Sequence, residues 1–382
     1  MYAKDPNEKK VNLGIGAYRD EHGKPWILPA VQQANHEYQP ISGFPPFNAA
    51  ACRLLFGEDA ASIKEGRLVV NQTISGTGAN HLGAMFLHHF YPFPNGEKKI
   101  YVTDPSWPNH FAIFKAAGVT PALFPYYDAP TRSLAFDRMM GALRDMPDGS
   151  VVLLHACAHN PTGVDPTESQ WRDIAEVFAK KRLFAFFDSA YQGFASGDPA
   201  KDAFAVRLFE SRGDIAMLVC QSFAKNAGLY GERIGALHVL TGSPEQAQAV
   251  SSQLNLITRS EMSTDPVYGA RIVHKILTEP ELRAEWNRNI QTMSQRIISM
   301  RHALFEQLTQ RLKTPGTWNH IVEQTGMFSF LGIDEEQCHR LVTEGHIYLV
   351  KTGRISMAGL NPGNVAYVAE WIDRVVRERA NL

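Results

Sequence analysis

An apolar run at residues 151–156 constrains the fold of this chain more than any other feature. Strands that face water on one side alternate apolar and polar residues, so a continuous apolar run predicts a strand covered on both faces, as in a parallel sheet. Further strand-like runs alternate with helical patterns, at residues 68–73, 99–103, 183–187, 215–220 and 234–240. This alternation predicts an α/β fold with a mostly parallel sheet and helices on both faces.

The helical patterns divide the chain into a longer and a shorter part. In the longer part, helices are expected at residues 79–90 and 170–181. Beyond Pro280, apolar residues recur every three or four positions as far as Leu312, which predicts one long amphipathic helix that ends near Pro315. The elements expected after it are strands at residues 327–331, 347–350 and 354–357 and helices at 335–344 and 364–379. A chain of 382 residues is too long for one compact core, so we expect two domains, the second a smaller α/β unit.

Composition argues against several classes of partner. The formal net charge of −1 gives no electrostatic reason to expect binding to nucleic acid or to an anionic membrane. No apolar run approaches the length of a membrane span, and residues 1–10 are polar, without an apolar signal region. The four cysteines are scattered, which is typical of free thiols in a reducing compartment. We therefore expect a cytoplasmic protein, with the mitochondrial matrix as the alternative if a presequence has been removed.

Lys225 follows the strand expected at residues 215–220 and lies between Ser222 and Arg233. A lysine that is desolvated at the end of an apolar strand can lose its proton and attack carbonyl groups. Serine and arginine are phosphate ligands, so this segment indicates a lysine that forms a Schiff base with a phosphate-bearing aldehyde, which describes pyridoxal phosphate. The alternative is a solvated lysine at a strand end, with an ordinary surface arginine nearby.

The segment Ser75-Gly76-Thr77-Gly78 follows another strand and opens a helix. Its backbone N–H groups and the helix dipole could therefore hold a phosphate. A dinucleotide site would require glycine at position 81, where this chain has histidine. We expect a cup for a single phosphate, and the alternative is a plain tight turn.

Three side chains, His155, Cys157 and His159, alternate at the end of the run at 151–156 and would share one face of a strand. That spacing makes a metal conceivable, but no second pair of ligands is apparent. We therefore expect hydrogen-bonding histidines under a turn and no metal. Asn160 begins that turn and is expected to direct its amide into the crevice.

Asp188 ends the strand expected at residues 183–187, and Tyr191 follows three residues later. A carboxylate at the end of an apolar strand is costly unless it is paired with a cation or hydrogen-bonded. Ligands of open α/β sheets bind beyond the carboxyl ends of the strands, so we expect both side chains in the crevice that holds Lys225. The alternative role for Asp188 is to cap the next helix.

Nearly the whole chain resembles one family through these segments and a few others. The family is the aspartate aminotransferase branch of the fold-type I, pyridoxal-phosphate-dependent aminotransferases. The most specific matching segments are residues 11–19 (Val-Asn-Leu-Gly-Ile-Gly-Ala-Tyr-Arg), 75–78, 107–110 (Trp-Pro-Asn-His), 155–163, 188–193, 222–233 and 353–360 (Gly-Arg-Ile-Ser-Met-Ala-Gly-Leu). The resemblance implies a large cofactor-binding domain at residues 15–292 and a small domain formed by residues 1–14 and 293–382.

The resemblance also implies a role for each matching residue. Lys225 would hold the cofactor and move a proton, Asp188 would pair with the pyridinium nitrogen, and Arg354 would bind the substrate's α-carboxylate. The implied catalytic residues are Lys225, Asp188, Tyr191 and Trp107. The implied cofactor-binding residues are Ser75, Gly76, Thr77, Trp107, His110, Asn160, Asp188, Tyr191, Ser222, Lys225, Arg233 and, from the partner subunit, Tyr38. The implied substrate-binding residues are Gly16, Trp107, Asn160, Arg354 and, from the partner subunit, Arg259, which would bind the distal carboxylate.

The activity implied by the resemblance is transamination between aspartate or glutamate and 2-oxoglutarate or oxaloacetate by a ping-pong mechanism. The implied assembly is a homodimer with shared active sites. Compared with the family pattern, we expect no N-terminal arm before Val11 and a shorter segment between Trp26 and Tyr38. The chain also has Met262-Ser-Thr-Asp-Pro266 where the family has Tyr-Ser-Asn-Pro-Pro.

Three alternatives to this activity remain. A broad aminotransferase that also takes aromatic amino acids would use the same residues, and Met262 favours it because methionine packs adaptably. A different pyridoxal phosphate enzyme, such as a lyase, is disfavoured by the two carboxylate-binding arginines, Arg354 and Arg259. A non-catalytic ligand-binding module is disfavoured by the intact set of Lys225, Asp188 and Tyr191.

Overall fold

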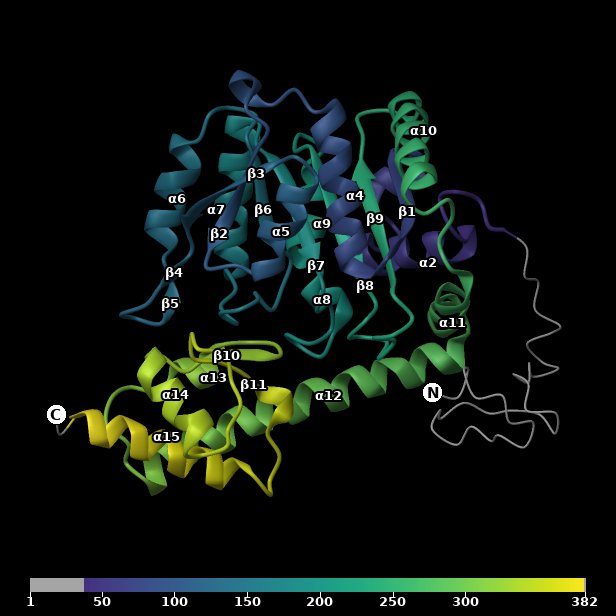
Figure 1. Cartoon of the computed structure of the whole chain (residues 1–382). Coiled ribbons are helices and arrows are strands. Elements are labelled where there is room, and N and C mark those ends of the chain that lie inside the picture. The colour runs from purple at the N-terminus through teal and green to yellow at the C-terminus, as the bar shows by residue number, and fades with distance from the viewer. Residues whose placement is uncertain (1–37, 381–382) are drawn as a thin grey trace, which may run out of the picture. The chain divides into compact units, whose positions relative to one another are not determined.

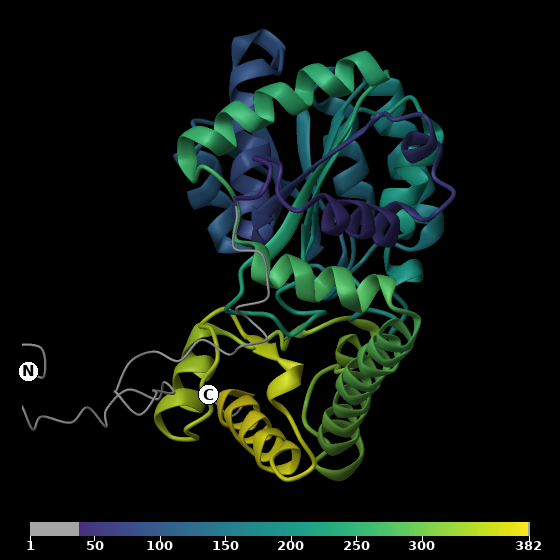
Figure 2. The ribbon, with the colours of Figure 1, turned by 90° about the vertical axis from the view of Figure 1, so that its right-hand side faces the viewer.

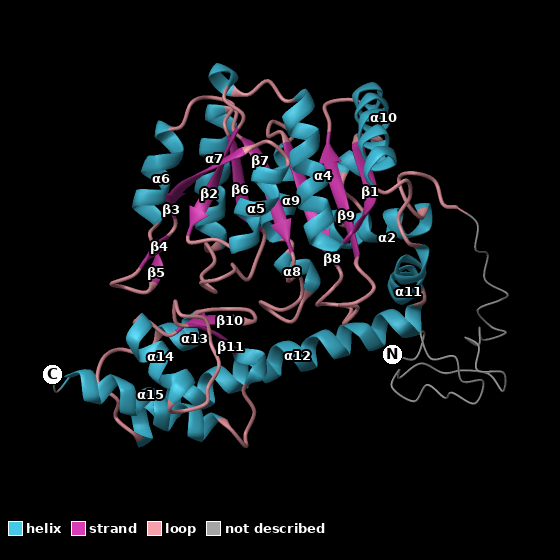
Figure 3. Cartoon of the chain, in the orientation of Figure 1, coloured by secondary structure: helices cyan, strands magenta, loops and turns pink. Residues whose placement is uncertain are grey.

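The computed structural model describes residues 38–380. Residues from Gln39 onward form one compact unit, whereas Tyr38 belongs to a separate N-terminal unit. Gly16 lies outside the described residues. So do the region before Val11, where we expect no N-terminal arm, and most of the shortened segment between Trp26 and Tyr38. Figures 1 and 3 show the helices and strands of the chain.

The strands are β1 (Leu68–Ile74), β2 (Lys99–Asp104), β3 (Thr120–Pro125), β4 (Tyr127–Asp128), β5 (Ser133–Leu134), β6 (Val151–His155), β7 (Phe184–Ser189), β8 (Met217–Ser222), β9 (Ile234–Leu240), β10 (Phe328–Phe330) and β11 (Arg354–Ser356). The α-helices are α2 (Pro45–Phe56), α3 (Ala61–Lys64), α4 (Ser75–Phe90), α5 (Pro108–Ala116), α6 (Phe136–Asp145), α7 (Glu168–Lys181), α8 (Pro199–Asp202), α9 (Phe204–Arg212), α10 (Pro244–Glu261), α11 (Val267–Thr278), α12 (Pro280–Glu306), α13 (His320–Glu323), α14 (Glu335–Thr343) and α15 (Val365–Ala380).

Seven strands form the main sheet, in the order β1-β9-β8-β7-β6-β2-β3. The pairs β2–β3, β2–β6, β6–β7 and β7–β8 are parallel, which confirms the expected mostly parallel α/β sheet. Strand β9 runs antiparallel to both of its neighbours, β1 and β8. It reverses because the short loop at residues 223–233 joins it to β8, whereas a parallel connection needs a longer crossover.

Helices cover both faces of this sheet, as Figure 2 shows from the side. Helices α4, α5 and α10 pack on one face, and α6, α7 and α9 pack on the other. Strand β6 explains why the run at 151–156 is apolar throughout. Val151 and Leu153 belong to the core on the side of α4, α5 and α10, and Val152 and Leu154 belong to the core on the side of α6, α7 and α9. Successive side chains of a strand point to opposite faces, so both sets must be apolar.

The 27-residue helix α12 links the sheet to the C-terminal elements (Figure 1). Near its start, Trp286 and Ile290 pack with α2 and α11, and further along Met300 and Leu304 pack with the C-terminal helices α14 and α15. The C-terminal core is therefore distinct from the two cores of the sheet. The division of the chain at residue 292 stays a prediction.

Two expected elements differ in the structure. Residues 347–350 form no strand: Ile347 and Leu349 pack against the C-terminal core while Tyr348 is exposed, so the alternation comes from a loop that covers a core. Helix α4 begins at Ser75 rather than Ala79, because the glycine-rich turn is itself the first turn of the helix. No described helix has the length and apolar character needed to cross a membrane.

Candidate active site

One pocket of about 400 Å³ lies where β6, β7 and β8 end and α4 begins. Because β1 and the three parallel strands end on the same side of the sheet, their last residues meet there. Eleven of the predicted site residues line it: Ser75, Gly76, Thr77, Trp107, Asn160, Asp188, Tyr191, Ser222, Lys225, Arg233 and Arg354. The remaining lining residues are His155, Cys157, Ala190, Ala224, Tyr230 and Phe328.

The N-terminus of α4 forms an anion-binding end of this pocket. No side chain caps the helix, so its first N–H groups remain available to a ligand. The hydroxyls of Ser75 and Ser222 lie 3.0 Å apart, and Arg233 lines the same pocket. A side chain at Gly76 would place its Cβ 3.1 Å from the Cβ of Ser222, so glycine keeps the cup open. The arrangement suits a single phosphate.

Lys225 lies in the loop after β8, and its side chain turns toward the pocket. Its Nζ is 4.8 Å from the centre of the Tyr191 ring and makes no hydrogen bond with another described residue. Burial lowers the pKa of Lys225, Asp188 opposes that shift, and Arg233 adds to it, so the net direction is down. A lysine whose pKa is lowered can supply a neutral amine for attack on a carbonyl or for proton transfer.

Asp188 is the next-to-last residue of β7, and one of its carboxylate oxygens is hydrogen-bonded while the other has no described partner. Its Oδ2 lies 2.9 Å from Nε2 of the fully buried His110, whose Nδ1 lies 3.0 Å from the hydroxyl of Ser106. Burial by itself raises the pKa of Asp188, but the hydrogen bond with His110 and the nearby His155 and Lys225 outweigh burial and lower it. Asp188 is therefore ionised, and it does not cap a helix.

The second carboxylate oxygen of Asp188 indicates which kind of ligand group the pocket would bind. Its Oδ1 is buried, with no hydrogen-bond partner among the residues that the structure describes. A buried carboxylate oxygen without a donor is costly, so it indicates a cationic or N–H group of a ligand. The protonated ring nitrogen of pyridoxal phosphate is such a group. The phosphate cup suits the phosphate of this cofactor, and Lys225 suits its aldehyde. The residues present fit this cofactor.

The two histidines near the end of β6 form hydrogen bonds rather than a metal site. His159 lies 3.0 Å from the hydroxyl of Thr103 and 2.8 Å from that of Thr162, and His155 accepts from the N–H of Asn160 at 3.3 Å. Burial lowers the pKa of His155 to about 3, and it lowers that of His159 as well, so both rings are neutral. Within residues 38–380, no group of histidine, cysteine and carboxylate side chains is arranged to hold a metal ion.

Arg354 forms the other end of the pocket. Its Nη1 donates to Oδ1 of Asn160 at 3.0 Å, and its guanidinium carbon lies 4.4 Å from the centre of the Phe328 ring. The remaining N–H groups of its planar guanidinium, which we call the Arg354 fork, are available to bind a carboxylate. Burial and the charge of Asp188 raise the pKa of Tyr191, so its phenol keeps its proton and can donate a hydrogen bond.

Two of the predicted residues in the compact unit from Gln39 onward, His110 and Arg259, do not line the pocket. His110 lies behind Asp188 and packs edge-on against Trp107 at 5.1 Å. Arg259 is exposed near the end of α10 and donates to the hydroxyl of Ser263. Tyr38 is exposed, and Gly16 lies outside the described residues.

Phe328 and Tyr230 are pocket residues that the sequence did not point to. Phe328 comes from β10, far along the chain, and nothing in its sequence context distinguishes it from a core residue. Tyr230 lies between Lys225 and Arg233, so its place in the same loop was the available signal.

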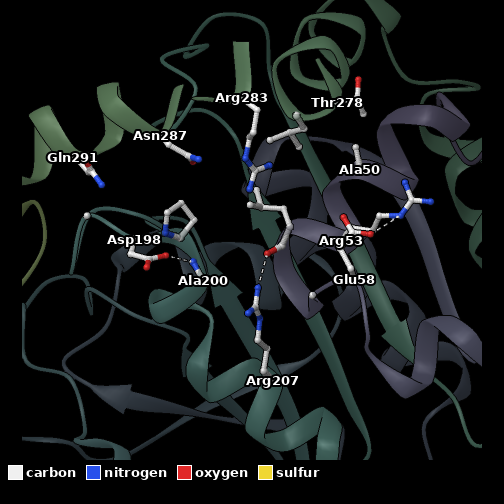
Figure 4. A pocket seen from close by; sticks show the side chains of 15 residues that line it. Ala50, Arg53, Glu58, Asp198, Ala200, Arg207, Thr278, Arg283, Asn287 and Gln291 are labelled. Carbon is white, nitrogen blue, oxygen red and sulfur yellow. Dashed lines mark hydrogen bonds and ion pairs between the residues drawn. The ribbon is translucent and has the colours of Figure 1, made fainter. Parts of the chain in front are cut away.

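A larger hollow lies elsewhere, between α2, α8 and the start of α12 (Figure 4). Most of its charged groups are already bonded: Arg53 pairs with Glu58, Arg207 donates to the carbonyls of Leu54 and Leu55, and Asp198 caps α8, while Arg283 stacks on the ring of Trp286. None of the predicted site residues that the structure describes lines this hollow. The pocket at the strand ends is therefore the candidate active site.

Comparisons with known proteins show the family of the chain. The family of class I and II aminotransferases matches residues 8–372. The cytoplasmic aspartate aminotransferase of Saccharomyces cerevisiae is 48% identical over 392 aligned residues, which cover 98% of this chain and 93% of that protein. The mitochondrial aspartate aminotransferase of Schizosaccharomyces pombe is 50% identical, covering 98% of this chain and 86% of that protein. An aromatic-amino-acid aminotransferase of Burkholderia pseudomallei, solved covalently bound to pyridoxal phosphate, has a TM-score of 0.87 and 41% identity, covering 98% of this chain and 94% of that one.

Proposed function

This chain belongs to the class I and II aminotransferase family, and from that membership we propose that it transfers the amino group of aspartate or glutamate to a 2-oxo acid. One observation in the site carries the proposal: Lys225, the ionised Asp188 and the Arg354 fork line a single pocket. The near-complete match to two aspartate aminotransferases supports the choice of substrate. Pyridoxal phosphate is the proposed cofactor, and the reaction proceeds in two half-reactions.

The polar residues at the centre and the phosphate end of the pocket would hold the cofactor. When bound, pyridoxal phosphate supplies a sink for the electrons released at the substrate's Cα. Asp188 holds its negative charge against the ring nitrogen, and His110 orients it from behind. Ser75, Ser222 and Arg233 bind the phosphate together with the N-terminus of α4.

Arg354 and Lys225 act on the substrate. Arg354 binds the α-carboxylate through two parallel hydrogen bonds, with Asn160 fixing one side of its fork. Burial lowers the pKa of Lys225, so its neutral amine can take the proton from the substrate's Cα. The same amine would then donate this proton to a carbon atom of the cofactor. Tyr191 donates a hydrogen bond from its protonated phenol, and Trp107 forms a wall against the ring.

The proposed assembly is a homodimer in which each site borrows residues from the other chain. Arg259 is exposed and lies outside the pocket of its own chain, which supports a role at the neighbouring site. There it would bind the distal carboxylate of aspartate, and Tyr38 would reach the phosphate. The proposed domain boundary follows residue 292. The relatives include cytoplasmic and mitochondrial enzymes, so the cytoplasmic location stays a prediction.

A broad-specificity aminotransferase is the second candidate, since an aromatic-amino-acid aminotransferase matches the chain almost as fully. A panel of amino donors with 2-oxoglutarate, compared by kcat/KM, separates the two. The proposal expects aspartate to exceed phenylalanine and tyrosine by at least about tenfold, the value of one carboxylate contact. Equal values would favour the second candidate. A cofactor absorbance that does not change on adding glutamate would contradict both.

A further inference from the structure

Two chain segments meet at the Arg354 end of the pocket, residues 158–165 and residues 324–328. Glycines allow their close approach: a Cβ on Gly163 would lie 2.7 Å from the carbonyl oxygen of Phe328, and a Cβ on Gly326 would lie 2.3 Å from the Cβ of Ala158. The N–H of Thr325 donates to the carbonyl of Gly163 at 2.6 Å. The first segment follows the sheet strand β6, and the second leads into the C-terminal strand β10 at Phe328, so this contact joins the two parts of the fold.

Asp165 ties the two segments together with its carboxylate. In the first segment it accepts hydrogen bonds from the N–H groups of Ala158 at 2.6 Å and His159 at 2.9 Å. From the second segment it accepts the hydroxyl of Thr325 at 3.0 Å. Ala158 has φ of 50°, a conformation that is unfavourable for a residue with a side chain. The carboxylate therefore holds a strained loop and a neighbouring segment in one arrangement.

Arg301 holds the second segment from its other side. It lies on α12 with 2% of its surface exposed. Its guanidinium donates to the carbonyls of Ile321 at 2.8 Å, Gly326 at 2.9 Å and Phe328 at 2.5 Å. A buried arginine that loses such acceptors is strongly destabilised, so these carbonyls keep fixed positions.

The two joined segments carry the two contacts that orient Arg354. Asn160, from the first segment, accepts a hydrogen bond from one arm of the guanidinium, and Phe328, from the second, packs against its face. Because an error of about 1 Å in a positioning group costs a large factor in rate, the distance between the segments matters for binding a carboxylate. We propose that Asp165, Thr325 and Arg301 form a positioning clamp that sets the direction of the Arg354 fork. None of the three lines the pocket, and the inference rests on the proposed role of Arg354.

The test replaces one hydroxyl of the clamp. Thr325→Val keeps the shape of the side chain and removes its hydrogen bond to Asp165, whereas Thr325→Ser keeps the hydroxyl. Thr309→Val is the matched control, because Thr309 donates to the carbonyl of Phe305 at 2.7 Å within its own helical turns, away from the pocket. The probe is maleate, an unreactive dicarboxylate, titrated against the holoenzyme. The affinity of the apoenzyme for pyridoxal phosphate is measured in parallel.

Thr325→Val is expected to weaken maleate binding and raise the KM for aspartate by about three- to tenfold, the value of one hydrogen bond. Its cofactor affinity should change less than about twofold, and its Tm should fall no more than that of Thr309→Val. Thr325→Ser should restore maleate binding. A purely structural role would lower Tm without this selective loss, and wild-type maleate affinity in Thr325→Val would overturn the proposal.

A structure of Thr325→Val decides the inference independently of activity. The clamp requires that the hydrogen bond between Arg354 and Asn160 lengthen or break, and an unchanged 3.0 Å contact overturns it. Failure of the proposed function gives a different result. In that case the unaltered holoenzyme would bind no maleate, while the structure of the variant would still decide the clamp.

Discussion

Replacing Asp188 with asparagine removes one negative charge from the centre of the pocket with little change in shape. The hydrogen bond with His110 and the nearby Lys225 lower the pKa of Asp188, so the wild-type side chain is ionised at pH 7. Its second oxygen has no described partner and is available to the ring nitrogen of the cofactor. Asparagine keeps an acceptor for a hydrogen bond but cannot hold that nitrogen protonated near neutral pH.

The size of the effect follows from the buried charge. Two unit charges 4 Å apart interact by about 4 kcal/mol at an effective dielectric constant of about 20. Each 1.36 kcal/mol of barrier is a factor of about ten in rate, so Asp188→Asn should lower kcat by about three decades. Asp188→Glu keeps the charge at the expense of geometry and should be at least about tenfold faster than Asp188→Asn.

The assay measures oxaloacetate formed from aspartate and 2-oxoglutarate at saturating pyridoxal phosphate. Cofactor occupancy is determined from absorbance for each variant, so that a loss of binding is not taken for a loss of turnover. Melting curves check that both variants are folded. If fully loaded Asp188→Asn turned over like the wild type, the charge would have no part in catalysis and the reasoning would be wrong.

Three further predictions follow from the same structure. Lys225→Ala should bind pyridoxal phosphate through the phosphate cup but lose nearly all turnover; borohydride reduction of the wild type should label Lys225, and label on another lysine would contradict this. Arg259→Ala should lower kcat/KM for aspartate at least about tenfold and leave phenylalanine nearly unchanged. Mixing it with Lys225→Ala should restore activity toward one native site per heterodimer, and a mixture that stays inactive although mass spectrometry shows exchange would exclude action in trans. Stability should fall as pH drops from about 6.5 toward 3, because burial lowers the pKa of His238 to about 3 and only the unfolded chain takes up its proton in that window. In urea titrations His238→Gln should reduce this slope by up to about 1.4 kcal/mol per pH unit, and an unchanged slope would refute the assignment.

The strands of the sheet could be predicted where burial on both faces requires a continuous run of apolar residues. The strands expected in residues 68–240 appear within two residues of their expected bounds. The direction of β9 could not be predicted, because an apolar run indicates that a strand is buried but not whether it runs parallel or antiparallel to its neighbours. The strand expected at 347–350 was wrong for a related reason: a loop that covers a core alternates apolar and exposed residues as an edge strand does.

The candidate site could be predicted to the extent that it lies at strand ends. Asp188, Lys225 and Asn160 each follow an apolar run, and parallel strands bring such residues to one edge. Arg301 could not be recognised, because on a long amphipathic helix a buried arginine looks like one whose charged end reaches water. Asp165 was equally hidden, since its partner Thr325 is distant in the sequence and only the fold brings the two together.

The order of strands in the sheet has a consequence for how the chain is made. Strand β1, which leads directly into the phosphate cup, has β9 as its one partner among the described strands, so that Leu68 lies opposite Leu240. On the ribosome, β1 emerges early and must wait for the whole of the intervening chain before it finds its neighbour. Such distant pairings form slowly and leave strand edges open to aggregation meanwhile. A nascent chain that stops short of β9 has no finished cup, so the cofactor can stabilise only a chain whose synthesis has passed residue 240.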